Sequence, residues 1–411
     1  MFCDKIFESS YIKRIVQDEG VISKCKCCGE NNIKCIDEKK LYQILEQIID
    51  LFEPDEDLRD HVRCEIIDEI EDEFDVDFSE IELEIEDKLE ELVERRLNTF
   101  ECTLSHNINR FFKVFSNRIS EEMQNEVLNS VLEHSKYYNK YLASEAWIFK
   151  FDNSGEITMG LNEIKNTIRY DNRFCINISQ LFDKHYPWKL EEVLTDHAEI
   201  IHSDKKFFRA RLGCEMTEDE FYSEKIAYDR ENIGKPPKQK AKNNRLSPVG
   251  IAYLYLSNCI NTSISEVRPF LGQLVSIGEF KLCKQIKIIN FSKNNIKIDI
   301  QKDMDIESEI KKIIVYKYLQ NEFSKPFDPQ KVDLEYVTLQ ILGEFIKNLG
   351  YDGIMYKSAM GEGGNLLVFN DKHVKCIGTE LVKVNNIQHD HKKYDSFSDS
   401  EIFNEVFPLF S

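Results

Sequence analysis

The residues best suited to chemistry lie in one stretch of the 411-residue chain, from Arg245 to Pro269. An arginine in a loop with proline and glycine precedes an apolar run over 251–256, which is rich in Tyr and Leu. Because turn residues bound this run, it predicts a buried strand. A strand that feeds a short helix would place Arg245, Tyr255 and Glu266 around one cleft. Such a cleft suits an anionic, ring-bearing ligand such as a dinucleotide.

Two further arginines lie upstream, in the segment Phe208-Arg-Ala-Arg211. Alternate side chains of an extended strand face the same way, so Arg209 and Arg211 could form one anion-binding surface. Arginine holds phosphate groups through paired hydrogen bonds, although a solvated surface charge is the alternative for each residue. The basic segment 234–245 is either a lid over phosphates or a mobile connection.

Five cysteines fall within the first forty residues: Cys3, Cys25, Cys27, Cys28 and Cys35. Cys25-Lys-Cys-Cys28-Gly is a C-x-x-C followed by glycine, the form of a zinc knuckle, in which a tight turn directs two thiolates at one ion. Cys3 and Cys35 could supply the other two ligands. The alternative is a set of small buried thiols in a reducing compartment.

The elements that position these residues change character along the chain. From residue 40 to about 204, apolar side chains recur at helical spacing, which predicts an all-helical segment. From about residue 207, short apolar runs alternate with helical stretches, and this mixture suits a compact mixed sheet. The expected strands are 207–208, 251–256, 274–277, 286–289, 353–356 and 366–369, and the expected helices are 306–323 and 334–349.

The charge and composition of the chain limit the kinds of partner that it is expected to bind. The formal net charge of −20 argues against broad affinity for nucleic acid or anionic membranes. Residues 53–96 carry 21 Asp+Glu against five Lys+Arg, so most of the acidity belongs to one segment, either a solvated helix face or a mimic of nucleic acid. The chain lacks an apolar run long enough to span a membrane and a secretory signal at its start, so a cytoplasmic location is expected.

Three ordered motifs in the C-terminal half resemble the RES domain, which is named for its arginine, glutamate and serine. Arg245, Tyr255 and Glu266 follow the order of the first motif. The second is Gly350-Tyr-Asp-Gly-Ile-Met-Tyr-Lys-Ser358 and the third is Asn365-Leu-Leu-Val-Phe369, while Phe208–Arg211 resembles the strand that opens the domain. The chain departs from the family at Asn244, where glycine is usual, and at Leu246-Ser247, where an aromatic-Asn pair is usual.

The resemblance implies an α+β protein in which an N-terminal all-α domain precedes a mixed α/β domain with an ADP-ribosyltransferase-like fold. Two-domain proteins of this kind begin with a cysteine-containing segment and continue with a helical domain of the HEPN-like type. Their first cysteine pair is commonly Cys-x-x-Cys, whereas Cys3 stands alone here. The expected divisions are 1–40 (cysteine segment), 41–205 (HEPN-like domain), 206–380 (RES domain) and 381–411 (tail).

The resemblance also implies consumption of NAD, by hydrolysis or phosphorolysis of the nicotinamide–ribose bond, in a bacterial toxin or anti-phage effector. An antitoxin or trigger protein and an oligomer are then expected partners. The barrier to this reaction is the positive charge that develops on the ribose, which a nearby carboxylate stabilises. In the roles that the resemblance assigns, Glu266 stabilises that charge, Arg245, Arg209 and Arg211 bind phosphates, Tyr255 and Ser358 position the ribose, and Asn365 contacts the ligand.

Three alternatives stay open at this stage. Ser263-Ile-Ser-Glu266 is also a capping box, in which Glu266 only satisfies the start of a helix. The same fold could transfer ADP-ribose to a macromolecule instead of water or phosphate. The acidic helices over 53–96 could also make the chain a non-catalytic interaction protein.

Overall fold

The structure is a computed structural model that describes twelve stretches of the chain. Within them the chain forms two compact units, Met1–Asp152 with Asn295–Ile310 (the first unit) and Asn153–Asn294 with Lys311–Ser411 (the second unit). The acidic segment 53–96 lies almost entirely outside the described residues, as does the tail beyond 387. No helix in the described stretches combines the length and apolarity needed to cross a membrane. The described residues are 1–54, 63–64, 66–67, 89, 93, 108, 112–134, 147–149, 154–218, 223–294, 296–327 and 331–387.

The first unit contains a three-stranded antiparallel sheet in the order β1-β3-β2. Its strands are β1 (Phe2–Cys3), β2 (Val21–Ser23) and β3 (Ile33–Ile36). Apolar side chains at helical spacing on α1 and α2 are fully buried, as for Ile12 and Val16. The helices of this unit are α1 (Ser10–Glu19), α2 (Glu38–Ile49) and α6 (Glu121–Leu132), and a further strand pair joins β4 (Phe52–Pro54) to β5 (Trp147–Phe149).

The prediction of an all-α domain over 41–205 is wrong, because β4, β5 and β6 (Ala198–Ile201) lie inside it. Each of these strands has three or four residues, too few to show a period of two in the sequence. Each is defined by pairing with a distant segment, as Phe52 pairs with Phe149. Helices do form in the rest of this range, namely α2, α6, α8 (Ser154–Asn166), α9 (Ile178–Phe182) and α10 (Leu190–Thr195).

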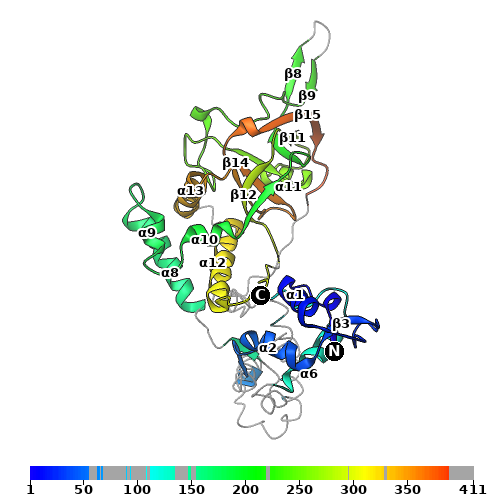
Figure 1. The fold of residues 1–411 in the computed structure, drawn as a ribbon. Coiled ribbons are helices and arrows are strands. Elements are labelled where there is room, and N and C mark those ends of the chain that lie inside the picture. Colours follow the sequence, from blue (N-terminus) through cyan, green and yellow to red (C-terminus); the bar gives the residue numbers. More distant parts are fainter. Residues whose placement is uncertain are drawn as a thin grey trace. The chain divides into compact units, whose positions relative to one another are not determined.

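The second unit is built on an eight-stranded mixed sheet in the order β15-β11-β7-β10-β14-β13-β12-β6 (Figure 1). This confirms the mixed sheet expected for the C-terminal half. All neighbouring strands are antiparallel except β12 and β13, and α12 (Ile306–Ser324) and α13 (Val332–Asn348) separate that parallel pair in sequence. The strands are β7 (Lys206–Leu212), β10 (Leu254–Ser257), β11 (Leu274–Leu282), β12 (Ile286–Phe291), β13 (Gly353–Lys357), β14 (Gly364–Val368) and β15 (Val374–Lys383).

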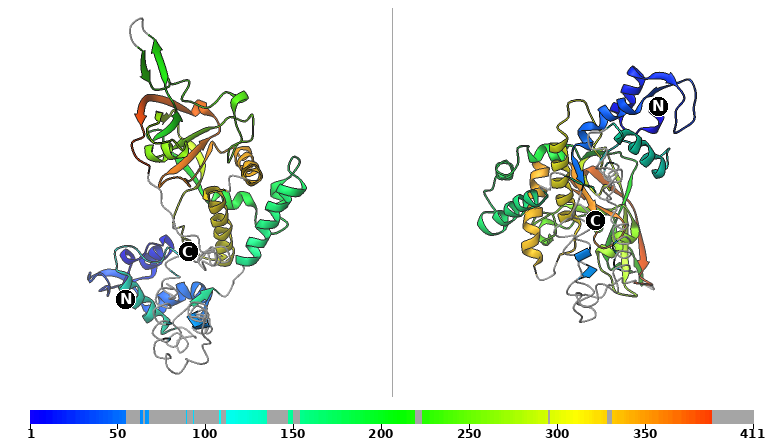
Figure 2. Two further views of the ribbon diagram at one scale, coloured as in Figure 1. Left: turned by 180° about the vertical axis from the view of Figure 1, so that it is seen from behind. Right: turned by 90° about the horizontal axis from the view of Figure 1, so that it is seen from below.

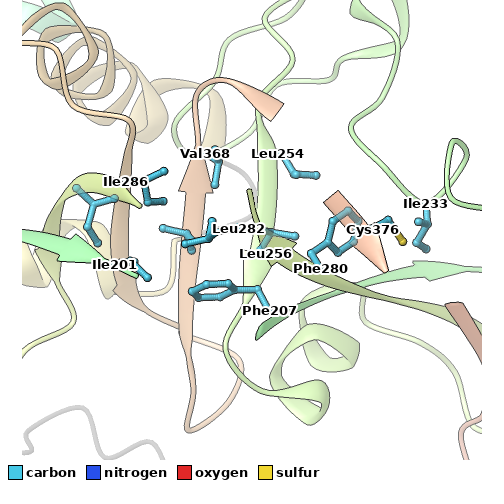
Figure 3. Packing of buried hydrophobic residues seen from close by; sticks show 12 residues of the cluster. Ile201, Phe207, Ile233, Leu254, Leu256, Phe280, Leu282, Ile286, Val368 and Cys376 are labelled. Carbon is cyan, nitrogen blue, oxygen red and sulfur yellow. The ribbon is translucent and has the colours of Figure 1, made fainter. Parts of the chain in front are cut away.

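A short hairpin of β8 (Glu215–Glu218) and β9 (Ser223–Ile226) projects away from this sheet (Figures 1 and 2). On the sheet itself, Leu254 and Leu256 pack into a core with Phe207 and Phe280 (Figure 3). Burying each leucine contributes about 1.5–3 kcal/mol, so this register is strongly preferred over one shifted by a residue. Because successive side chains alternate between faces, Tyr255 lies on the opposite face from the two leucines.

Candidate active site

A cavity of about 1000 Å³ lies in the second unit, at the upper end of the range for small-molecule sites. Its walls come from β7, β10, β13, the loop before β10, the segment around 326–336 and α11 (Ile260–Glu266). Among the described residues, six of the eight charged side chains that line it are cations. A cationic cavity in a chain of net charge −20 concentrates positive potential at one place, which favours an anionic ligand. These eight are Arg209, Arg211, Lys240, Lys242, Arg245, Arg268, Glu266 and Asp333.

Glu266 is the last residue of α11, which begins at Ile260 after Cys259, whereas a capping box would place Ser263 at the start of the helix. The capping-box interpretation is therefore wrong, since Glu266 stands at the opposite end of the helix from the free N–H groups. Its Oε1 atom instead accepts two hydrogen bonds of 2.6 Å, from Ser358 Oγ and from Asn365 Nδ2. One carboxylate oxygen is thus fixed by two donors at the cavity wall.

The sheet brings these three residues together, although Ser358 and Asn365 lie 92 and 99 residues after Glu266 in the sequence. β14 lies between β10 and β13, so Asn365 pairs with Ser257 on one side and with Tyr356 on the other. Asn365 is buried, and its Oδ1 accepts a 2.7 Å hydrogen bond from Ser257 Oγ. This contact leaves the amide nitrogen directed at Glu266.

The glycine-rich loop between β13 and β14 packs directly on the start of α11. Gly363 N donates to Thr262 Oγ1 at 3.0 Å, and Gly364 N donates to Asn258 Oδ1 at 2.9 Å. A Cβ atom at Gly363 would lie 2.5 Å from Thr262 Oγ1, so this close approach requires glycine. The loop also fixes Ser358, whose Oγ accepts a 3.0 Å hydrogen bond from Met360 N.

Arg209 and Arg211 both line the cavity, on the same side of β7 as predicted. Arg209 donates one hydrogen bond of 3.0 Å to the carbonyl of Tyr255, while its Nε is buried with no partner among the described residues. Burial, and then the charge of Arg211, lower the pKa of Arg209 to about 10. A cation in this condition gains from an anionic ligand that supplies the missing acceptor.

Arg245 lines the cavity but is held by other groups. Its guanidinium donates to the carbonyl of Phe323 and lies 4.7 Å from the ring centre of Phe327 and 6.0 Å from that of Tyr356. Such cation–π contacts fix the orientation of the guanidinium plane. Arg245 therefore joins the loop before β10 to two aromatic walls of the cavity.

Tyr255 and Tyr356 form aromatic walls of the cavity. The Tyr255 hydroxyl lies 2.9 Å from Ser247 Oγ, and burial raises the pKa of Tyr255 to about 12. Tyr255 thus contributes its ring to the cavity, while its hydroxyl fixes the loop before β10. Tyr356 is also buried, which raises the pKa of its hydroxyl.

Six of the residues predicted from sequence line this cavity, and the seventh, Ser358, contacts it through Glu266. Sequence reasoning did not select Tyr356 or Arg268, which also line it. Tyr356 could have been found, because it lies two residues before Ser358 in the same motif and alternate strand residues share a face. The local sequence around Arg268 carries no comparable signal. The six are Arg209, Arg211, Arg245, Tyr255, Glu266 and Asn365.

The cysteines lie in the first unit. The sulfur atoms of Cys3, Cys25 and Cys28 lie within 4.8 Å of one another, and those of Cys3 and Cys28 are 3.5 Å apart. Cys35 is buried and pairs directly with Cys3 between β1 and β3, but it lies outside this group of three.

Comparison with known proteins finds a family model that matches part of the chain. No curated protein matches the chain. A chain in the crystal structure of the M. tuberculosis MbcT–MbcA toxin–antitoxin complex is similar to this chain, with 10% sequence identity and a TM-score of 0.29. The similar region covers 47% of this chain and 90% of that chain. That likeness is too distant to carry a functional argument. The family model described as RES domain matches residues 227–388, a range that contains Arg245, Tyr255, Glu266, Ser358 and Asn365. Residues 227–388 therefore match a RES domain, and most of them belong to the second unit.

Proposed function

We propose that the second unit binds NAD in this cavity and breaks the bond between nicotinamide and ribose. The observation that carries the proposal is the fixed carboxylate of Glu266 at a cavity whose other charged walls are mainly cationic. The RES domain over 227–388 supports the choice of NAD, since resemblance to that family implies NAD as the substrate.

The chemistry needs little more than a well-placed negative charge. When the bond between ribose C1′ and the nicotinamide nitrogen breaks, its electron pair goes to nicotinamide, which leaves as a neutral molecule. The positive charge stays on the ribose, and a carboxylate beside it stabilises the transition state. Water or phosphate then forms the new bond to C1′, with loss of a proton.

Glu266 is arranged to supply this charge. Among the described residues its hydrogen bonds reach only Oε1, which leaves Oε2 for the ligand. Ser358 and Asn365 act in this proposal by holding the carboxylate, so Ser358 is a positioning residue as well as a candidate contact to ribose. Asn365 is itself held by Ser257, which makes the orientation reproducible.

The cations of the cavity would hold the pyrophosphate. Arg209 offers a buried Nε that has no partner within the described part of the chain, and Arg211 lies two residues along the same strand. Arg245 would act from a fixed position, set by Phe327 and Tyr356. The aromatic rings of Tyr255 and Tyr356 would pack against the planar bases of the ligand. A role as a toxin or defence effector, with an antitoxin or trigger as partner, follows from the family resemblance and is part of the same proposal.

The test is incubation of the purified full chain with NAD, with and without phosphate, followed by chromatography of the products. We expect nicotinamide with ADP-ribose for hydrolysis, or with phosphorylated ADP-ribose for phosphorolysis. Glu266→Gln keeps the shape and removes the charge, and we expect it to lower kcat by about 10²–10³-fold. Glu362→Gln is the matched control, because Glu362 is an exposed carboxylate on the loop between β13 and β14. Absence of nicotinamide release, or equal activity of the two variants, would overturn the proposal.

A further inference from the structure

We propose that the first unit holds one structural zinc ion through the sulfur atoms of Cys3, Cys25, Cys28 and Cys35. This site is separate from the proposed NAD chemistry, because none of its residues belongs to the second unit. Its role would be to stabilise the small sheet at the start of the chain.

The first reason is the convergence of three sulfur atoms from two distant segments. Those of Cys3, Cys25 and Cys28 lie within 4.8 Å of one another, and the Cys3–Cys28 distance is 3.5 Å. A Zn–S bond of about 2.3 Å in a tetrahedral site places sulfur atoms about 3.8 Å apart. The three sulfurs are therefore already close to the separation that one zinc ion requires.

The second reason is the backbone of the turn that carries Cys25 and Cys28. Gly29 N donates to the Cys25 carbonyl at 3.1 Å, and Gly29 has a φ of +73°, where glycine is favoured. Lys26 N donates to Met1 O at 3.1 Å, which docks the turn beside β1. This is a tight turn that presents two thiols toward the strand bearing the third.

The environment of Cys25 supports the same conclusion. Its side chain is fully buried, and the backbone N–H groups of Cys28, Cys3 and Cys27 direct hydrogen bonds at its sulfur atom. Backbone N–H groups that converge on a sulfur atom stabilise a thiolate, which is the form that binds metal.

Cys35 is the best fourth ligand. It pairs directly with Cys3 across the antiparallel strands β1 and β3, so the two side chains lie on the same face of the sheet. Cys35 is also fully buried. Cys27 is the competitor, but it lies inside the turn between two ligands, whereas closed structural sites commonly combine one pair from a turn with a second pair from elsewhere. Soft thiolate ligands in a tetrahedral set select zinc among the common divalent ions.

An ion at this position would connect β1, β3 and the turn. These strands have two and four residues, and a sheet this small has little core of its own. Binding free energy at such a site acts as folding free energy for the unit that holds it.

The experiment measures zinc in the full-length protein by mass spectrometry of the metal and affinity by competition with a chelator. We expect one zinc per chain. Loss of a residue that only supports a metal ligand weakens metal binding by roughly 10–100-fold. Cys28→Ser and Cys35→Ser each remove a ligand, so each should weaken zinc binding by more than this. Cys27→Ser and the exposed Cys283→Ser are the matched controls and should retain the ion.

A second measurement avoids dependence on variants that fail to fold. The wild-type chain is stripped of metal and reloaded with cobalt(II), and we expect the intense near-ultraviolet absorption of cobalt bound to thiolates. Three results would overturn the proposal: less than half an equivalent of zinc with no cobalt absorption, a Cys3–Cys28 disulfide in freshly purified protein, or equal losses of affinity in Cys27→Ser and Cys35→Ser.

Discussion

Removal of the Ser358 hydroxyl tests how the candidate site holds its carboxylate. Ser358→Ala deletes one of the two donors to Glu266 Oε1 and leaves the donor from Asn365 in place. Ser358→Thr retains a hydroxyl at the same position and is the matched control. We expect Ser358→Ala to lower kcat for nicotinamide release, and we expect Ser358→Thr to retain most of the activity.

The size of the effect follows from the hydrogen bond. A hydrogen bond to a charged group contributes about 1.5–3 kcal/mol, and Ser358 is only half-buried, so the lower value applies. About 1.5 kcal/mol of lost orientation corresponds to roughly a tenfold lower kcat. If Ser358 acts through Glu266, the Ser358→Ala change should lower kcat less in the Glu266→Gln variant than in the wild-type protein. There the acceptor is a neutral amide oxygen, and the bond is worth about 0.5 kcal/mol, or roughly twofold.

The assay is therefore a double-mutant cycle on initial rates of nicotinamide release, with NAD affinity measured by calorimetry in the slow Glu266→Gln background. The reasoning is refuted if Ser358→Ala causes the same loss with Glu266 present and absent. That result would assign Ser358 a contact to the ligand that is independent of the carboxylate. Equal losses for alanine and threonine at position 358 would also refute it.

Three further predictions concern other residues of the second unit. Arg209→Met removes a half-buried cation whose Nε has no hydrogen-bond partner among the described residues. The free energy of unfolding should therefore stay level or rise, while NAD affinity falls at least about tenfold. Calorimetry measures the affinity, urea unfolding measures the stability, and a loss of stability would contradict the prediction. Gly363→Ala places a Cβ 2.5 Å from Thr262 Oγ1, so the loop must shift. Nicotinamide release should fall by roughly tenfold or more, and the urea midpoint should also fall, because the overlap costs about 1–3 kcal/mol. Unchanged rates would show that the loop does not position the site. Burial lowers the pKa of His197 to about 4 in the folded protein, whereas the pKa of an unfolded histidine is about 6.5. Between these two values the unfolded state binds one more proton than the folded state. The folded state therefore loses stability as the pH falls from about 6.5 toward 4. Between pH 7 and pH 5 the free energy of unfolding measured in urea should therefore fall by about 2 kcal/mol. His197→Gln should remove this pH dependence, and His202→Gln, at an exposed histidine, should keep it. The reverse pattern would show that His197 is not the group responsible.

The strands of the second unit could be predicted from the sequence wherever a buried strand is a continuous run of apolar residues. The expected strands at 274–277 and 286–289 appear as the longer β11 and β12, and the expected helix over 306–323 appears as α12. β15 was missed, because its side chains are mostly half-buried or exposed and its sequence shows no apolar run. It is defined instead by pairing with β11.

The site was predictable in its composition but not in its contacts. The order of the motifs indicated that Arg245, Glu266 and Asn365 belong to one site, and all three line the cavity. The sequence could not show that Phe327 would lie against Arg245, because no spacing rule links residues on separate segments of an irregular wall. The capping-box alternative had the right residue spacing, and it failed because the helix already begins at Ile260, with Cys259 in the N-cap position that the alternative gave to Ser263.

Asn365 is the residue at which the register of the sheet determines the chemistry. It is paired with Ser257 of β10 and with Tyr356 of β13, and it shares a face with both. A shift of β14 by one residue would turn Asn365 to the other face and replace its amide with the apolar side chain of a neighbour. Leu366 and Val368 oppose that shift, because both pack in the core with Leu254 and Leu256, and removing them from it would cost about 3–6 kcal/mol. The packing of Leu366 and Val368 thus fixes the strand, and the strand fixes the amide that directs Glu266 into the cavity.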